Sequence, residues 1–148
     1  MRANSHFATA VHILTLLACS EGLLSSSCIA RSVNTNPVVI RQIVQRLRCA
    51  HLVRTEPGRS GGVTLQRSPK EITLADVYAL FREDVFFNLH PSAPNPLCPV
   101  GRNIQAVLLG VSSEAEELVV QALRRLTVAD ILARVADCEA RVTLEASA

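Results

Sequence analysis

Arginine is the residue type with the clearest potential chemistry in the first half of this 148-residue sequence. Residues 25–67 hold seven arginines and a single carboxylate, Glu56, so seven positive charges and one negative charge give this stretch a net charge of +6. Guanidinium groups bind phosphate through paired N–H donors, and they suit the edge of guanine and a narrow minor groove. Residues 71–148 differ, because six arginines there stand against eleven acidic residues. The first half is therefore expected to bind a polyanion, and double-stranded DNA is the expected partner.

A glycine-rich stretch, GRSGG at 58–62, raises the alternative of a nucleotide-binding loop. A Walker-type loop needs a lysine followed by Ser or Thr and then a helix, and a dinucleotide loop needs GxGxxG. Neither pattern is present, and Val63 and Leu65 after the glycines suit a strand. We predict a β-hairpin whose strands include 52–55 and 63–65, with glycines at its tip that allow positive φ and a close approach to another surface.

Short helices must position these arginines. The stretch SSSCIARSV predicts a helix capped by Ser25 or Ser26, and NTNP ends it. Asn36 then caps a second helix that has Pro37 at its first position. The apolar residues of this second helix recur at helical spacing and are Ile40, Ile43, Val44 and Leu47. Helix, tight turn and helix is the spacing of a helix-turn-helix.

The second helix of such a motif directs its first residues into the major groove of DNA. Arg41 suits a guanine edge, and the valines beside it suit thymine methyl groups. Helix-start N–H groups can bind phosphate, and Arg59 at the hairpin tip is placed to enter the minor groove. The candidate DNA-binding residues are Ser25, Ser26, Asn36, Val38, Val39, Arg41, Arg46, Arg48, Arg59, Ser60 and Gly61. As an alternative, one of the two valines is a core residue, and Arg46 and Arg48 are solvated.

The rest of the chain predicts a mainly α fold with this one small β-hairpin. We expect a DNA-binding domain over 1–87, a Pro-rich loop over 88–101, and a long helix followed by a C-terminal helix over 102–148. The long helix is expected to break near Gly110, with a capping box of Ser113 and Glu116 after the break. Its second part carries an apolar stripe, Leu118, Val119, Ala122, Leu123 and Leu126. Such a helix favours a homodimer interface, with packing on its own domain as the alternative.

Caps are also expected farther along the chain and at its start. Thr73 with Asp76, and Thr127 with Asp130, predict two more helix starts.

The first twenty residues resemble a short signal peptide, but their apolar residues recur at helical spacing and His12 interrupts the run. We therefore predict a helix from Ser5 to about Cys19, no membrane span and a cytoplasmic protein.

Five cysteines occur at irregular spacing, which is not typical of a secreted disulfide framework. We expect Cys19, Cys28 and Cys49 to be small core residues, since they fall on or near apolar faces. Cys98 lies in the Pro-rich loop near a helix start, where a thiolate is favoured, and it is the candidate redox thiol. The alternative is a passive loop cysteine.

Together these motifs resemble the Rrf-two family of bacterial winged helix-turn-helix transcription regulators. The resemblance rests on SSxxIA, NPVVIR, LxxAxLV, the wing GRSGG and ITLADV, and it covers nearly the whole chain. It implies a homodimer with a long dimerisation helix that binds a partly palindromic operator, usually as a repressor. Family members include regulators of iron–sulfur assembly, nitric-oxide stress and cysteine metabolism.

The sequence departs from the family at the iron–sulfur site. Several members bind a cluster through three closely spaced cysteines in the loop before the long helix, and here Cys98 stands in that loop without the other two. Because such clusters normally need four ligands, His90 and Asn95 would complete a poor set, and we expect no metal and no cofactor. The chain is more similar to cluster-free members, some of which respond to oxidants or small electrophiles through thiols.

Two other functions are open at this point. A winged-helix module that binds proteins rather than DNA has the same elements. An enzyme could use a Cys–His pair of Cys98 and His90, but PSAPNP between them is typical of a loop and no cofactor loop or paired carboxylates can be read. We therefore expect a regulator and no enzymatic activity, with a small molecule or an oxidant as its effector.

Overall fold

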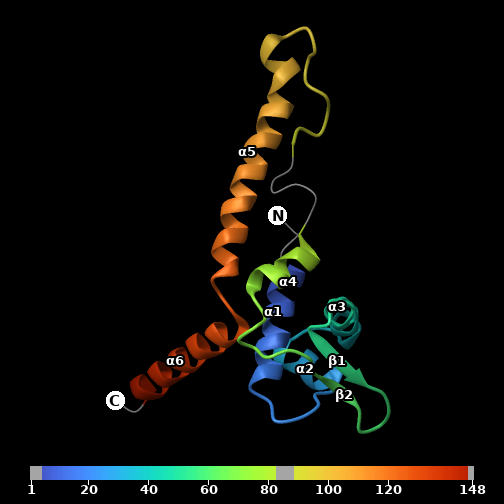
Figure 1. Ribbon diagram of the computed structural model, residues 1–148, viewed down its shortest axis with the longest axis vertical. Coiled ribbons are helices and arrows are strands. Elements are labelled where there is room, and N and C mark those ends of the chain that lie inside the picture. Colours follow the sequence, from blue (N-terminus) through green and yellow to red (C-terminus); the bar gives the residue numbers. More distant parts are fainter. Residues whose placement is uncertain (1–4, 83–88, 147–148) are drawn as a thin grey trace.

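The computed structural model describes residues 5–82 and 89–146. Over these residues the chain forms six helices and one two-stranded antiparallel sheet (Figure 1). The elements are α1 Ser5–Ala18, α2 Ser26–Val33, α3 Pro37–Cys49, β1 Val53–Glu56, β2 Gly62–Leu65, α4 Leu74–Phe81, α5 Pro99–Arg124 and α6 Val128–Ala146. Helices α1 to α4 and the hairpin form a compact body, from which α5 projects in one direction and α6 in another (Figure 1). The prediction of a mainly helical chain with one hairpin is confirmed.

The turn between α2 and α3 follows from local hydrogen bonds. The side chain of Ser25 accepts a hydrogen bond from the Cys28 N–H at 3.2 Å, and that of Asn36 accepts one from the Val38 N–H at 2.8 Å. Asn34 ends α2 in the left-handed region with φ 58°, which asparagine tolerates better than most residues. The predicted helix, tight turn and helix is confirmed.

The hairpin pairs Val53 with Leu65 and Glu56 with Gly62. A third segment joins the edge of β2, because Leu24 and Val63 exchange backbone hydrogen bonds of 3.0 and 2.9 Å. Gly58 has φ 104°, as expected for the tip. The close approaches made by the other two glycines are to the chain itself: a Cβ at Gly61 would overlap the Glu56 carbonyl oxygen, and one at Gly62 would lie 2.7 Å from the Leu24 carbonyl oxygen. The strand–tip–strand geometry is therefore set by backbone packing.

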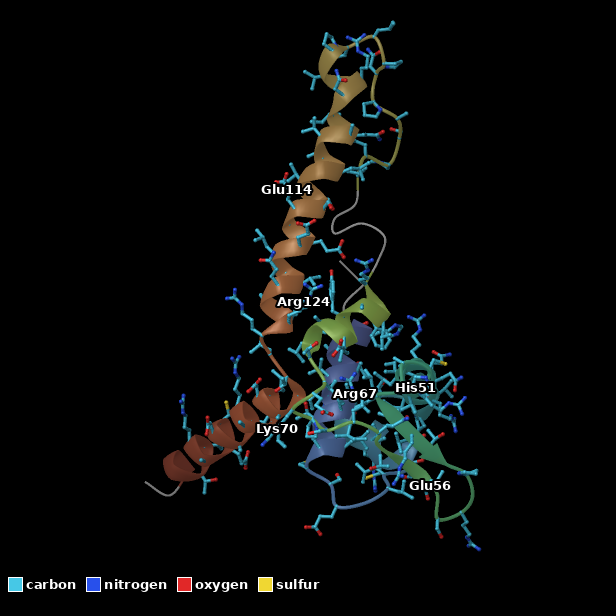
Figure 2. The ribbon with its side chains drawn as sticks, in the orientation of Figure 1. His51, Glu56, Arg67, Lys70, Glu114 and Arg124 are labelled. Carbon is cyan, nitrogen blue, oxygen red and sulfur yellow. The ribbon has the colours of Figure 1, made fainter. Side chains whose placement is uncertain are left out.

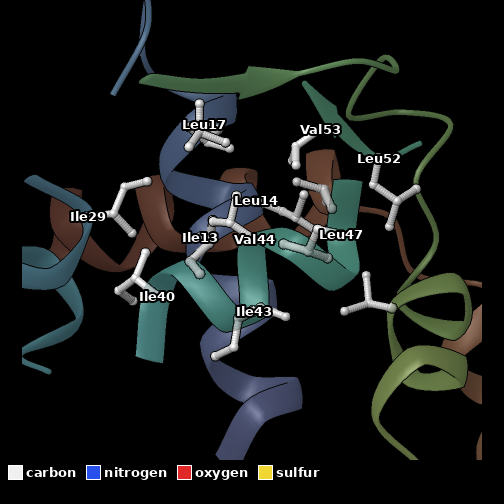
Figure 3. Close-up of a cluster of buried hydrophobic side chains, with 14 of the residues drawn as sticks. Ile13, Leu14, Leu17, Ile29, Ile40, Ile43, Val44, Leu47, Leu52 and Val53 are labelled. Carbon is white, nitrogen blue, oxygen red and sulfur yellow. The ribbon is translucent and has the colours of Figure 1, made fainter. Parts of the chain in front are cut away.

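One aliphatic core fixes α3 against the body. The predicted apolar stripe of α3 is buried, and it packs against residues of α1, α2 and the hairpin (Figure 3). The side chains labelled in Figure 3 are Ile13, Leu14, Leu17, Ile29, Ile40, Ile43, Val44, Leu47, Leu52 and Val53. Since one face of α3 is held inside, its opposite face must point to solvent.

The starts of α4 and α6 are joined. Thr73 and Asp76 form a reciprocal capping box, with hydrogen bonds of 3.0 and 3.2 Å. Thr127 and Asp130 repeat this arrangement, and the hydrogen bonds that Thr127 donates lower the pKa of the Asp130 carboxyl. Thr73 also pairs with Thr127 as an antiparallel bridge. Both predicted helix starts are confirmed. The Thr73–Thr127 bridge attaches the start of α6 to the start of α4.

The long helix differs from the prediction. Helix α5 runs without a break from Pro99 to Arg124, so the expected interruption near Gly110 is wrong. One glycine costs a helix only about 1 kcal/mol, which a 26-residue helix tolerates. The expected capping box of Ser113 and Glu116 is wrong for the same reason, because both residues lie inside the helix. Helix α5 begins three residues before the expected 102, and the expected domain boundary at 87 lies outside the described residues.

Two cysteines also differ from the prediction. Cys19 and Cys49 are exposed and Cys28 is half-buried, so the assignment of Cys19 and Cys49 to the core is wrong. Cys19 follows the last residue of α1, and Cys49 lies on α3 opposite its buried stripe. Among the described helices, none is both long and apolar enough to cross a membrane.

Candidate nucleic-acid interface

A row of exposed side chains follows the outer face of α3. Val38, Gln42, Gln45 and Cys49 recur at intervals of four, three and four residues, opposite the buried stripe, and all are exposed. We call these four residues the outward row of α3. Arg41 is exposed beside them. The outer face of α3 therefore exposes the amides of Gln42 and Gln45 and the apolar side chain of Val38, with the Arg41 guanidinium beside them.

Two members of the outward row, Gln42 and Gln45, were missed by the sequence reasoning. Attention to arginine passed over neutral amides, although the spacing from Val38 to Cys49 could have found them. Glutamine can donate to and accept from an adenine edge in the major groove. These residues therefore join Arg41 as candidates for base contact.

The remaining candidates near the start of α3 lie in different environments. Val38 is 49% exposed, whereas Val39 is half-buried and packs against the core. The Asn36 side chain is engaged as the cap of α3, and Ser25 is engaged as the cap of α2. Ser26 is half-buried at the first position of α2. The structure thus places Val38, and not Val39, with the outward row.

The hairpin tip lies on the same side of the body as α3 (Figure 1). Arg59 and Ser60 are exposed between Gly58 and Gly61, and the Gly61 N–H donates to the Gly58 carbonyl at 3.1 Å. Gly61 itself is half-buried. The turn is closed by this backbone hydrogen bond, so it holds the Arg59 side chain away from the body.

The arginines of this half divide by their contacts. Arg46 donates to the Leu80 carbonyl at 3.4 Å and lies over the Phe81 ring, 5.5 Å from its centroid. Arg67 donates to the Glu71 carbonyl at 2.8 Å, which ties down the segment before α4. The other arginines of residues 25–67 are exposed: Arg31, Arg41, Arg48, Arg54 and Arg59.

Charge is segregated along the molecule. In Figure 2, Arg67 and Lys70 extend from the segment after the hairpin, and Glu114 extends from α5. Glu116, also on α5, pairs with Arg82 at 3.2 Å. The basic half therefore belongs to the body that carries α3 and the hairpin, while carboxylates gather on α5 and α6.

The candidate thiol lies at the far end of α5. Cys98 is the exposed N-cap residue of that helix. The Cys98 side chain makes no cap hydrogen bond, but the nearby backbone N–H groups of Gly101 and Val100 lower the pKa of its thiol. The loop before it is folded onto the helix start, because the Cys98 N–H donates to the Asn95 carbonyl at 3.2 Å. This geometry favours the thiolate form.

Comparisons with known proteins agree with this arrangement. A profile of the Rrf2 family, described as an iron-dependent transcriptional regulator, matches residues 3–134. YwnA of Bacillus subtilis (strain 168), provisionally named an HTH-type transcriptional regulator, is 42% identical over 106 residues, which are 71% of this chain and 77% of YwnA. A solved structure of a protein provisionally called DNA-binding superposes with a TM-score of 0.70 and 32% identity, over 86% of this chain and 99% of that chain. IscR of T. potens shares the fold, with a TM-score of 0.67 and 22% identity over 91% of this chain and 88% of that chain.

The iron in the family description can be tested against the residues present. In residues 5–82 and 89–146, no three His, Cys, Asp or Glu side chains are grouped as a metal site requires. Within the described loop 89–98, Cys98 is the single thiol, and iron–sulfur clusters are held mainly by several cysteine thiolates. The described residues therefore do not fit an iron–sulfur cluster.

Proposed function

The chain belongs to the Rrf2 family of transcriptional regulators, and from that premise we propose that it is a cytoplasmic, homodimeric repressor that binds a partly palindromic operator in double-stranded DNA. The family and its curated relatives regulate transcription and are not enzymes. The observation that carries the proposal is the exposure of Arg41 and the outward row on α3 and of Arg59 at the hairpin tip, because these two elements lie on the same side of the body. In this proposal α3 enters the major groove and the hairpin reaches the adjacent minor groove. Repression rests on the family resemblance.

We assign the contacts with DNA bases to Arg41, which lies beside the outward row, and to Val38 and Gln42 within it. Arg41 would donate two hydrogen bonds to a guanine, and Gln42 would pair with an adenine. Val38 would contact a thymine methyl group. Ser25, Ser26, Arg48 and the backbone at the start of α2 would contact phosphates and set the register of the protein on the duplex.

The alternative is a winged-helix module that binds protein and not DNA. The double variant Arg41→Ala/Arg59→Ala separates the two functions when it is compared with wild type by fluorescence anisotropy. The DNA-binding proposal expects tight binding by wild type and weak binding by the double variant. The absence of duplex binding before and after the substitutions would favour the protein-binding module.

Removal of the Arg59 side chain is expected to weaken operator binding most when the flanking sequence is rich in A·T pairs. Such flanks have a narrow minor groove with a stronger negative potential, which attracts arginine. One lost phosphate-neutralising charge should also make the slope of log K against log salt shallower by about 0.9 per protomer. Anisotropy with A·T and G·C flanks around the same site measures both effects. Equal affinity of Arg59→Ala and wild type on both duplexes would remove Arg59 from the interface.

The homodimer is supported by an apolar row on α5. Val100, Ile104, Val107, Val111 and Leu118 recur at spacings of four, three, four and seven residues and lie along one side of the helix. Ile104 is half-buried and the other four are exposed, at 58% for Val107 and 67% for Leu118. Of the predicted stripe, Leu118 and Ala122 are exposed, while Val119 and Leu123 are half-buried. A second copy of α5 would cover the exposed row.

A carboxylate placed in this row should dissociate the dimer. We expect Val107→Glu to sediment as a monomer at concentrations where wild type sediments as a dimer, because burying an unpaired charge is strongly unfavourable. Leu109→Glu is the matched control, since Leu109 is 45% exposed on the opposite side of the same helix. Sedimentation velocity distinguishes the species. A dimeric Val107→Glu protein would place the interface elsewhere.

We further propose that Cys98 makes operator binding sensitive to peroxide. Its thiolate would attack hydrogen peroxide, forming an S–O bond as the O–O bond breaks, and water would leave after protonation. We expect oxidant to release wild type from DNA and to leave Cys98→Ser bound, as measured by anisotropy. Equal release of both proteins would assign the response to another cysteine, and binding of wild type in both redox states would remove the thiol response.

A further inference from the structure

A hollow lies beside α3, on the side away from the hairpin. Its volume is about 520 Å³, and its walls come from three helices: His6 of α1, Phe81 of α4, and on α3 the outward-row residues Val38, Gln42 and Gln45 together with Arg41, Ile43 and Arg46. In Figure 1, α3 lies between the hairpin and the neighbouring ends of α1 and α4. The hollow therefore extends from the outward row of α3 to the ends of α1 and α4, away from the hairpin.

The lining of this hollow is cationic. Two of its residues are arginines, Arg46 and also Arg41, which is assigned to a guanine above, and no carboxylate is among the lining residues that the structure describes. The first turn of α1, which contributes His6, also carries no acidic residue. The chemistry suits an oxyanion that accepts several hydrogen bonds.

The Arg46 side chain is held in place before any ligand binds. Its guanidinium lies over the Phe81 ring and donates to the Leu80 carbonyl. Phe81 is buried, and the His6 ring packs edge-on against it with centroids 6.3 Å apart. A guanidinium has five N–H donors, so donation to one carbonyl leaves others for a ligand. Because the side chain is already ordered, little rotamer entropy is lost on binding.

We propose that this hollow binds a backbone phosphate of the operator, on the strand that passes α3 on the side opposite to the hairpin. The inference rests on the proposed function, and it adds His6, Arg46 and Phe81 as a phosphate-binding unit. A helix in the major groove has a sugar–phosphate strand on each side. Arg46 is not in the outward row and lies where the hollow meets Phe81 of α4, so in this proposal it meets the strand while the row, along the α3 wall of the same hollow, meets the bases. Phosphate contacts on both sides would fix the register of α3 in the groove.

Neutral phosphates test the inference directly. Duplexes that carry one methylphosphonate at a time along the operator are measured with wild type and with Arg46→Gln. We expect one phosphate per half-site whose neutralisation weakens wild type but has no further effect on Arg46→Gln. The slope of log K against log salt should also become shallower by about 0.9 per protomer in Arg46→Gln. Arg141→Gln, which removes the same charge from the exposed face of α6, is the matched control and should retain both wild-type properties.

A second variant separates phosphate binding from packing on Phe81. Arg46→Lys keeps the positive charge and should keep the wild-type slope of log K against log salt. If this slope became equally shallow in Arg46→Lys and Arg46→Gln, the effect would come from lost packing on Phe81, and the inference would be overturned. Wild type could bind the operator and yet show no phosphate whose neutralisation weakens wild type but leaves Arg46→Gln unchanged. That result would overturn this inference and leave the proposed function standing. Failure of wild type to bind any duplex would overturn the proposed function and this inference with it.

Discussion

Raising KCl from 50 to 200 mM is expected to weaken operator binding about a thousandfold. The exposed arginines of residues 25–67 are present in both protomers, and six phosphates neutralised by the dimer, three by each protomer, give a slope of about −5.4 in log K against log salt. A fourfold rise in salt then lowers the association constant by about three orders of magnitude. Fluorescence anisotropy at five or six salt concentrations gives this slope.

The same titration on a shuffled duplex is the control for this prediction. Counterion release does not depend on sequence, so a steep slope is also expected there, from a lower starting affinity. A nearly flat slope on the operator would mean that the exposed arginines do not face phosphates. The DNA-binding surface would then have to be sought outside α3 and the hairpin.

Substitution of Arg41 by alanine is expected to lower operator affinity by about 1–3 kcal/mol, or roughly 5- to 150-fold. The physical reason is the loss of two hydrogen bonds to one guanine, so the loss should concentrate at a single base pair of each half-site. The measurement is the affinity of each protein for a set of operators that are mutated one base pair at a time. Mutation of the guanine pair should weaken binding by wild type and should have no such effect on Arg41→Ala.

Arg48→Ala is the matched comparison for Arg41→Ala. Arg48 is also exposed on α3, but two turns further along the helix, and it is assigned to phosphate. Its loss should weaken all sequences about equally and make the salt slope shallower by about 0.9 per protomer. The assignment of Arg41 to a base would be wrong if Arg41→Ala behaved in this uniform way.

Features that depend on a few neighbouring residues could be predicted from the sequence. The caps Ser25, Asn36 and Thr73 are confirmed because a cap needs only a short side chain and an N–H two or three residues later. The hairpin between Val53 and Leu65 is confirmed because strand residues flank a glycine-rich tip. Interactions between neighbouring residues determine such elements, and the same elements are present in the folded chain.

Features that depend on contacts between distant residues could not be predicted. His6 and Phe81 lie far apart in the sequence, and their packing beside Arg46 is a product of the fold. The continuity of α5 through Gly110 also escaped prediction, because a long helix tolerates the modest cost of one glycine. The candidates on α3 were its first residues and its arginines, so Gln42, which is neutral and lies further along, was passed over although helical spacing places it in the outward row.

Selection of bound duplexes from a random library, followed by sequencing, tests whether the protein reads DNA sequence as a symmetric dimer. We expect enrichment of one partly palindromic motif, with half-sites separated by about one helical turn or a multiple of it, because a symmetric dimer presents two copies of α3. Recovery of duplexes with no enriched motif would mean that the protein does not read DNA sequence through α3, and it would overturn the proposed function.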